Sequence, residues 1–285
     1  MVEQENLVRF INENANWRET MFKTRLLSGI ILMAITILFV ILGDDVLFAT
    51  SLIISLIGMM ELYRIEKIHL QAPGLVGYAA GILYYLLLYF DLPQYRLMLF
   101  ILFLMTLLFI AVFRYPEYKP EQMALVFMGL FYVGVMVSYI YQVRMLEDGG
   151  LLVWLIFIGA WGSDTCAYCV GKLLGKRKLA PKLSPKKSIE GSIGGIVGAA
   201  VIAFIYATIF KDNITGIENP QIVFAIIGAA SSIISQIGDL AASLIKRNYD
   251  IKDYGKLIPG HGGVLDRFDS ILFTAPIVYY LAVIL

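Results

Sequence analysis

The chain carries one polar stretch, residues 243–270, in which carboxylates, cations and glycines lie between two strongly apolar segments. Its charged side chains are Asp250, Asp253, Asp266, Asp269, Lys246, Arg247, Lys252, Lys256 and Arg267. The turn Pro259–Gly263 also places glycines on both sides of His261. Carboxylate oxygens are the ligands that Mg²⁺ prefers, whereas cationic side chains and glycine backbone amides bind phosphate. The stretch therefore predicts a site that holds a divalent metal ion and a phosphate group together.

Asp239 lies a short distance before this stretch, inside an otherwise apolar segment. A carboxylate at the centre of a membrane-spanning helix costs about 2.5–3.5 kcal/mol on insertion scales, so such a residue is a candidate for function. At helical spacing it shares a face with Ser243, Lys246 and Arg247. Because the polar loop joins the helices of Asp239 and Asp266, the two carboxylates can converge on one metal ion. A buried aspartate that pairs with a cation only for packing is the structural alternative.

Asp266 and Asp269 stand where the last apolar segment begins. Carboxylates in that position also stabilise a helix N-terminus through the helix dipole, which is the structural alternative for either residue. For His261 we expect a hydrogen bond to phosphate or to a neighbouring carboxylate in preference to direct metal ligation. Gly262 and Gly263 lack side chains and so allow backbone amides to approach a phosphate.

A second polar cluster covers residues 161–191 and contains Asp164, which also lies inside an apolar segment. The loop that follows carries the cations Lys172, Lys176, Arg177, Lys178, Lys182, Lys186 and Lys187. Cations at such a place can anchor the topology or bind anionic lipid head groups without any part in catalysis.

Residues 184–191 are more specific, since they place hydroxyl and ammonium groups on a turn just before a glycine-rich helix start. The candidate side chains are Ser184, Lys186, Lys187, Ser188 and Glu190. Hydroxyls, lysines and helix N-terminal amides donate hydrogen bonds to triphosphate oxygens. The GxxxxGK[ST] spacing of a P-loop is absent, so we predict a phosphate-binding turn of another kind.

The composition indicates the elements that must position these clusters. The chain is 59% hydrophobic and 16% charged, with a mean hydropathy of +0.76, which is far more apolar than a soluble globular protein. A span needs about 20 apolar residues. We predict an all-α polytopic membrane protein with about nine spans, at 25–42, 46–63, 74–90, 95–113, 122–142, 151–171, 192–210, 221–245 and 270–285.

The distribution of charge among the loops predicts the orientation, because cytoplasmic loops carry an excess of Lys and Arg. With a cytoplasmic N-terminus, all basic residues except Arg96, Arg144 and Lys211 fall on the cytoplasmic side. The loops 172–191 and 246–269 then share that side. A wrong number of spans would scramble this alternation, so the distribution supports both the number and the orientation.

The unusual chemistry divides the chain near residue 150. Residues 1–22 are predicted to be either a tail or an interfacial amphipathic helix. Residues 23–150 are predicted to form about five spans that are nearly free of charge, and residues 151–285 to form the catalytic membrane region.

Polar residues near the end of the second predicted span stand apart from both clusters. They are Glu61, Arg64 and His69. No matching constellation accompanies them, so we predict interfacial side chains without a part in the site.

Together the two clusters resemble the CDP-diacylglycerol synthases, also called phosphatidate cytidylyltransferases. The family signature has the form S-x-x-K-R-x₄-K-D-x-[small]-x₂-[apolar]-P-x-H-G-G-x-x-D-R-x-D. This chain meets it with Ser243, Lys246, Arg247, Lys252, Asp253, Gly255, Ile258, Pro259, His261, Gly262, Gly263, Asp266, Arg267 and Asp269. The segment from Asp164 through Lys187 to Gly191 resembles a second block that the family shares. So long a gapped pattern is far more specific than either cluster alone.

The resemblance implies an enzyme that transfers the cytidylyl group of CTP to phosphatidic acid, giving CDP-diacylglycerol and pyrophosphate for phospholipid biosynthesis. It also implies Mg²⁺, K⁺ as a second cation, and a homodimer in the bacterial cytoplasmic membrane. CTP, phosphatidic acid and membrane lipids are the expected partners, and nucleic acid is not. The charged loops suit this reaction, because the phosphatidate dianion is already a nucleophile and its approach to CTP requires charge neutralisation.

On this basis we assign roles to the residues of both clusters. Asp239 and Asp266 are predicted metal ligands, with Asp164 and Asp269 as further ligands or as their neighbours. The residues predicted to be catalytic are Asp239, Asp266, Lys187, Lys246, Arg267 and His261. The residues predicted to bind the substrates are Ser184, Lys186, Lys187, Ser188, Glu190, Ser243, Arg247, Lys252, Asp253, Gly262 and Gly263.

Other functions fit part of the pattern. A CTP-dependent polyprenol kinase would use similar cations but transfer the γ-phosphoryl group. An ion or anion transporter with Asp164 and Asp239 in its pathway predicts charge on several spans around a central cavity, whereas this chain concentrates its charge in two loops. The D-G-x₂-A-R…G-x₃-D-x₃-D pattern of the CDP-alcohol phosphatidyltransferases is absent from the sequence.

Overall fold

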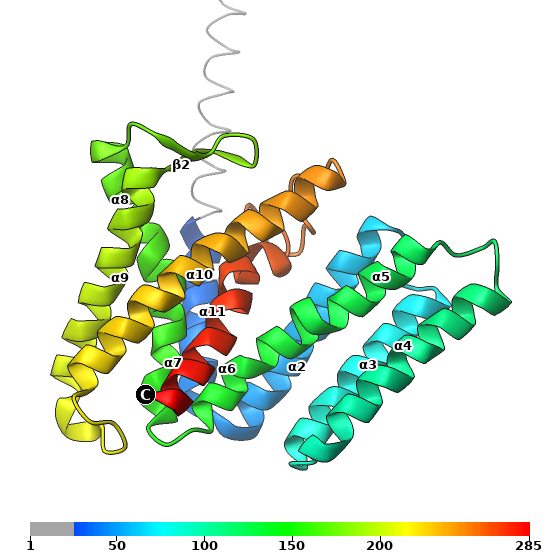
Figure 1. Cartoon of the computed structure of the whole chain (residues 1–285), viewed down its shortest axis with the longest axis horizontal. Helices are drawn as coiled ribbons and strands as arrows, with labels where there is room; N and C mark the ends of the chain where they lie inside the picture. The colour runs from blue at the N-terminus through cyan, green and yellow to red at the C-terminus, as the bar shows by residue number, and fades with distance from the viewer. Residues whose placement is uncertain (1–25) are drawn as a thin grey trace, which may run out of the picture.

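The computed structural model describes residues 26–285, and helices make up most of it (Figure 1). Residues 1–22, for which a tail or an interfacial helix was predicted, lie outside the described residues. The elements in chain order are α2 (Asp44–Ile65), α3 (Ala72–Tyr89), η1 (Pro93–Tyr95), α4 (Arg96–Phe113), α5 (Pro120–Gly129), η2 (Leu130–Val135), α6 (Met136–Arg144), α7 (Gly149–Phe157), η3 (Ile158–Gly162), α8 (Ser163–Leu174), β1 (Lys178–Ala180), β2 (Ser184–Ser188), α9 (Ile189–Ile209), η4 (Lys211–Asn213), α10 (Pro220–Asn248) and α11 (Leu265–Ile284).

The apolar helices agree with the predicted spans. Within residues 26–285, eight helices are long and apolar enough to cross a membrane, and a shorter apolar helix covers Leu26–Leu42. Two of the eight contain π-helical stretches, which join α5 to α6 (Pro120–Arg144) and α7 to α8 (Gly149–Leu174). The predicted class, an all-α polytopic membrane protein, is confirmed, while the direction of insertion stays a prediction.

The last span begins earlier than predicted. We expected it at 270–285, whereas α11 covers Leu265–Ile284 and follows the glycine turn almost directly. Asp266 and Asp269 therefore lie in the first turns of a helix, where their backbone is held in a regular conformation.

Helix α10 is the central support of the site, and it packs extensively against α9 and α11. Small residues permit the close approach of the backbones, as is usual between membrane helices. A Cβ atom at Gly228 in α10 would lie 2.8 Å from the backbone oxygen of Ala199 and 2.8 Å from the Cβ of Ala203, both in α9. Even one methyl group has no room at this crossing.

We therefore expect Gly228→Ala to lower the thermal stability of the detergent-purified protein. Overpacking of this kind costs about 1–3 kcal/mol, since backbone atoms cannot move aside as a side chain can. Gly162→Ala is the matched control, because a Cβ there would meet no atom closer than Ile202 Cδ1 at 3.6 Å. Equal melting temperatures for the two variants would contradict the close α9–α10 crossing.

The cationic loop contains a β-hairpin that replaces the turn predicted at residues 184–191. Strands β1 and β2 pair antiparallel, with Lys178 opposite Ser188 and Ala180 opposite Ser184. The loop lies beyond the apolar spans, where two extended segments satisfy each other's backbone hydrogen bonds. Within β2, Lys186 is exposed while Lys187 is half-buried.

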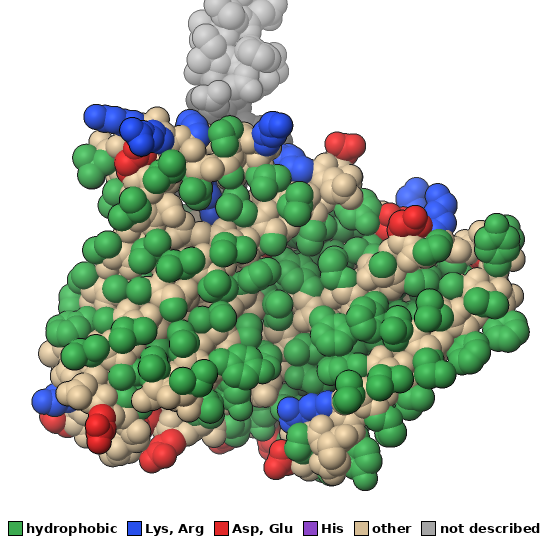
Figure 2. Space-filling view, viewed as in Figure 1, with side chains coloured by type: hydrophobic (Ala, Val, Ile, Leu, Met, Phe, Trp, Pro, Cys, Tyr) green, Lys and Arg blue, Asp and Glu red, His purple; other side chains and the backbone are tan. Residues whose placement is uncertain are grey.

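Both polar loops lie at one end of the helix bundle. In Figure 1 the hairpin and the junction between α10 and α11 both lie at the upper end, and the C-terminus lies at the lower end. Figure 2 shows Lys and Arg side chains gathered over the hairpin, above flanks covered by hydrophobic side chains. The fold thus brings the two predicted clusters to the same end of the molecule.

Candidate active site

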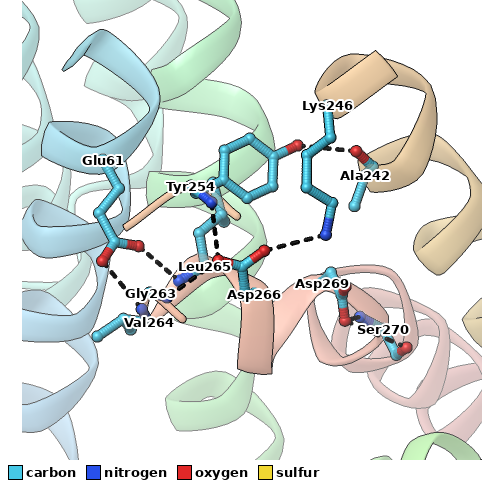
Figure 3. A network of polar contacts seen from close by, with 10 residues as sticks. All are labelled: Glu61, Ala242, Lys246, Tyr254, Gly263, Val264, Leu265, Asp266, Asp269 and Ser270. Atoms are coloured by element: carbon cyan, nitrogen blue, oxygen red, sulfur yellow. Dashed lines mark hydrogen bonds and ion pairs between the residues drawn. The ribbon is translucent and has the colours of Figure 1, made fainter. Parts of the chain in front are cut away.

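Asp266 is the most completely enclosed acidic group of the polar loop. Its Oδ2 accepts hydrogen bonds from the backbone amides of Tyr254 at 2.8 Å and Gly263 at 2.9 Å. Its Oδ1 pairs with Lys246 Nζ at 3.0 Å (Figure 3). The Asp266 side chain is 1% exposed and that of Lys246 is 16% exposed, so this is a buried ion pair. Such a pair is stable only when further hydrogen bonds satisfy the charges, as the two amides do here.

The glycine turn is shaped around this carboxylate. Gly262 has a φ of +88°, a conformation that side chains with a Cβ rarely adopt, and a Cβ there would lie 2.9 Å from Asp266 Oδ2. The amide of Gly263 donates to Asp266, although we predicted that these amides approach a phosphate. In this structure the turn positions an acidic side chain.

Tyr254 closes the other side of the pair. Its hydroxyl donates to the backbone oxygen of Ala242 at 3.2 Å, and the ammonium of Lys246 lies 5.3 Å from its ring centroid. Burial raises the pKa of the Tyr254 phenol far above its ordinary value, and the neighbouring carboxylates act in the same direction. The phenol therefore stays protonated and keeps its bond to α10.

A second ion pair joins the hairpin to α10. Lys187 Nζ on β2 lies 2.5 Å from Asp239 Oδ2, and the two side chains are 26% and 29% exposed. Asp239 is also within electrostatic range of Asp164 and Asp269. The Lys187–Asp239 pair thus links the cluster of residues 161–191 to α10, which leads into the polar stretch that holds the Lys246–Asp266 pair.

Two adjoining cavities open beside these pairs. One of about 330 Å³ is lined by Asp164, Lys186, Lys187, Ser188 and other residues of α8, β2, α9 and α10. Another of about 210 Å³ is lined by residues that include Asp164, His261, Asp266, Arg267 and Asp269. Asp164 lines both, so the cavities meet at a carboxylate.

His261 ties the glycine turn to the first described helix. Its Nδ1 is 2.8 Å from the hydroxyl of Ser28, and that hydroxyl also donates to the backbone oxygen of Pro259 at 3.0 Å. The ring lines the second cavity, so it is placed to reach a ligand there. The predicted hydrogen bond of His261 to a phosphate or to a neighbouring carboxylate stays a prediction.

Comparison with known proteins shows which family the sequence belongs to. The model of the "Cytidylyltransferase family" matches residues 23–285, which includes both clusters. The chain belongs to the cytidylyltransferase family. The phosphatidate cytidylyltransferase of Bacillus subtilis is 37% identical over 91% of this chain and 97% of its own length. Those of Staphylococcus saprophyticus and Staphylococcus haemolyticus are 32% and 33% identical over 92% of this chain and 99% of theirs. The chain is therefore an enzyme of this family.

Several predicted binding residues of this cytidylyltransferase family member have structural partners. Ser188 Oγ accepts from Gly191 N at 3.1 Å and so caps α9. Glu190 accepts from the backbone amides of Lys176 and Arg177 and holds the start of the hairpin.

Other predicted binding residues lie at the edge of the site. Arg247, Lys252 and Asp253 are exposed and line neither of the two cavities. Ser184 and Ser243 are half-buried and also line neither. Their part in binding stays a prediction.

One residue next to the site was interpreted wrongly from the sequence. Glu61 in α2 was predicted to be interfacial, yet it is 1% exposed and accepts from Val264 N at 3.0 Å and Leu265 N at 2.8 Å. The reason is tertiary, because α2 packs where α11 begins. Like Asp239, Glu61 is a carboxylate inside an apolar segment, and that property was the available signal.

The acidic side chains of the site do not by themselves form a complete metal-ligand cage. Among the residues that the structure describes, no group of three or more His, Cys, Asp and Glu side chains could hold a metal ion. Even so, the donor chemistry fits Mg²⁺, which takes few protein carboxylates and completes its shell with water and phosphate oxygens. Both predicted principal ligands, Asp239 and Asp266, already face a cationic group.

Proposed function

We propose that this enzyme transfers the cytidylyl group of CTP to phosphatidic acid, giving CDP-diacylglycerol and pyrophosphate. The observation that carries the proposal is the meeting of two lysine–aspartate pairs beside two adjoining cavities at one end of a membrane bundle. The names of the relatives, which are phosphatidate cytidylyltransferases, support the choice of substrates.

The residues supply charge and position more than acid–base chemistry. In the proposed reaction a phosphatidate oxygen forms a bond to the α-phosphorus of CTP, and the bond from that phosphorus to the bridging oxygen of pyrophosphate breaks. Two anions must approach each other, so the cations supply most of the stabilisation. Within residues 26–285, two buried donor atoms have no hydrogen-bond partner: Lys187 Nζ, which forms only the ion pair with Asp239, and Arg267 Nε. Both atoms can therefore donate hydrogen bonds to phosphate oxygens.

Asp239 and Asp266 would hold Mg²⁺ in this proposal, with Asp164 and Asp269 beside them. When bound, the ion neutralises negative charge on the phosphates. Binding would require Lys187 and Lys246 to exchange their carboxylate partners for substrate oxygens, which turns both ammonium groups toward the reacting phosphates. The K⁺ ion and the homodimer stay predictions.

An apolar cavity beside the polar one suits a lipid substrate. It has a volume of about 250 Å³ and is lined by side chains such as Phe39, Ile54 and Phe268 between the Leu26–Leu42 helix, α2 and α11. Leu32 lines both this cavity and the second polar cavity. A molecule with a charged head group and an apolar tail would fit a polar cavity that adjoins an apolar one. We place the enzyme in the bacterial cytoplasmic membrane, as the bacterial relatives suggest.

Incubation of the purified protein with phosphatidic acid, Mg²⁺ and CTP labelled at the α-phosphate tests the proposal. We expect label in the lipid phase. We expect EDTA to abolish this label, because EDTA removes the Mg²⁺ that would neutralise the charge of the phosphates. CTP labelled at the γ-phosphate, with a polyprenol acceptor, is the control for the kinase alternative. Lipid label from the γ-position alone would replace the proposed transferase by a kinase.

A further inference from the structure

Glu61 is a buried carboxylate that the proposed reaction does not use. It is 1% exposed, although an ionised carboxylate away from water is costly unless hydrogen bonds satisfy it. Its Oε1 and Oε2 accept from Val264 N and Leu265 N, at 3.0 and 2.8 Å. These amides belong to the N-terminus of α11, where backbone donors have no partner within the helix and negative charge is favoured.

The signature loop is built to receive this side chain. A Cβ at Gly255 or at Gly263 would overlap the Glu61 carboxylate, so both glycines are needed for its approach. Both are positions of the family signature, one of them the place that demands a small residue. The loop therefore wraps around a carboxylate that lies about 200 residues earlier in the chain.

Glu61 and Asp266 hold the same short turn through neighbouring amides. Gly263 N donates to Asp266, whereas the next two amides, those of Val264 and Leu265, donate to Glu61 (Figure 3). Asp266 follows directly and carries the pair with Lys246. A shift of the turn relative to α2 would move Asp266 and so disturb its pair with Lys246.

We propose that Glu61 is a positioning residue of the active site: from α2 it fixes the turn 263–265 and thereby the Asp266–Lys246 pair. The inference rests on the proposed function for its kinetic consequence. It also gives the N-terminal half of the chain a part in the reaction. Lys246, Asp266 and the backbone amides that bind Asp266 all come from α10, α11 and the loop between them, whereas Glu61 comes from α2.

The test uses the full chain in detergent, with Glu61→Gln and Glu61→Asp beside the wild type. Glutamine presents an NH₂ group to one of the two amide donors, so one hydrogen bond is lost and two donors face each other. For Glu61→Gln we expect kcat per folded protein to fall by about 10-fold to 100-fold, with KM for phosphatidic acid unchanged. Glu61→Asp keeps both oxygens on a shorter stem and should recover part of the rate.

Hydrogen exchange of the amides in residues 255–268 provides a readout that does not depend on activity. We expect faster exchange in Glu61→Gln than in the wild type. Glu117→Gln is the matched control, since Glu117 is an exposed carboxylate whose pair with Arg114 lies on the surface, and it should leave both readouts unchanged.

The outcomes separate this inference from the proposed function. If the wild type transfers no cytidylyl group, the proposed function fails, and the exchange data alone then decide whether Glu61 holds the turn. A Glu61→Gln enzyme with the wild-type kcat would overturn the inference. A loss of activity that merely follows the loss of folded protein would overturn it as well, because it would show a structural role only.

Discussion

Replacing Asp266 by asparagine is expected to lower cytidylyl transfer by at least about 100-fold and also to destabilise the fold. The carboxylate is nearly inaccessible, and it satisfies two backbone amides as well as the ammonium of Lys246. Asparagine would leave that ammonium without a counter-charge and would place an NH₂ group against a donor. Removing one partner of a buried ion pair costs about 3–5 kcal/mol. CDP-diacylglycerol formation and the melting temperature should therefore fall together.

Asp212→Asn is the control for this change, because Asp212 is an exposed aspartate in η4, outside both cavities. It should leave stability and rate unchanged. A second variant, Lys246→Met, removes the other partner and should be less destabilising than Asp266→Asn, because Asp266 would keep both backbone donors. A stable and fully active Asp266→Asn enzyme would contradict the role of this pair.

Much of the fold follows from the sequence because a bilayer imposes simple rules. The length of each apolar run predicted the spans, and the described helices agree with them. The cost of a carboxylate in an apolar segment singled out Asp239 and Asp164, which the fold places close together. The spans and these two carboxylates can be predicted from the sequence alone, because both predictions depend only on local properties of the chain.

The parts that could not be predicted depend on contacts between distant segments. Nothing near Glu61 in the sequence indicates that its partners are the amides of Val264 and Leu265. Likewise, a glycine turn suggests an amide for phosphate, whereas Gly263 N donates to Asp266. The family signature orders these residues along the chain but does not say which donor meets which acceptor.

The two lysine–aspartate pairs differ in a way that assigns them different tasks. The Lys246–Asp266 pair is buried, and Asp266 accepts hydrogen bonds from the backbone of the loop. This pair therefore stabilises the loop and also lies beside the second cavity. The Lys187–Asp239 pair is more than one-quarter exposed, and within residues 26–285 its ammonium has no hydrogen-bond partner beyond the ion pair itself. Solvent screens a partly exposed pair more than a buried one, so this pair contributes less to stability and can exchange partners when charged ligands arrive.

Asp239→Asn is therefore expected to lower cytidylyl transfer by at least about 100-fold, while the melting temperature falls less than in Asp266→Asn. The neutral amide binds a divalent cation far less tightly than a carboxylate and forms no ion pair with Lys187, whose ammonium would remain close to the first cavity. A bound metal ion supplies several kcal/mol of transition-state charge stabilisation, so weakening its site by one carboxylate ligand corresponds to a loss of rate of about 100-fold. The measurements are kcat with saturating CTP and phosphatidic acid, the Mg²⁺ concentration that gives half-maximal rate, and thermal unfolding of the same preparation.

Asp91→Asn provides the control, because Asp91 is exposed in the loop after α3 and its φ of +49° suits asparagine. Lys187→Gln tests the other half of the pair: it should raise KM for CTP and leave the Mg²⁺ requirement in place, since the carboxylate of Asp239 remains. The contrast between Asp266 and Asp239 is the decisive comparison. If Asp239→Asn lost stability as Asp266→Asn does, the second pair would be structural as well, and the division of tasks between the two pairs would be wrong.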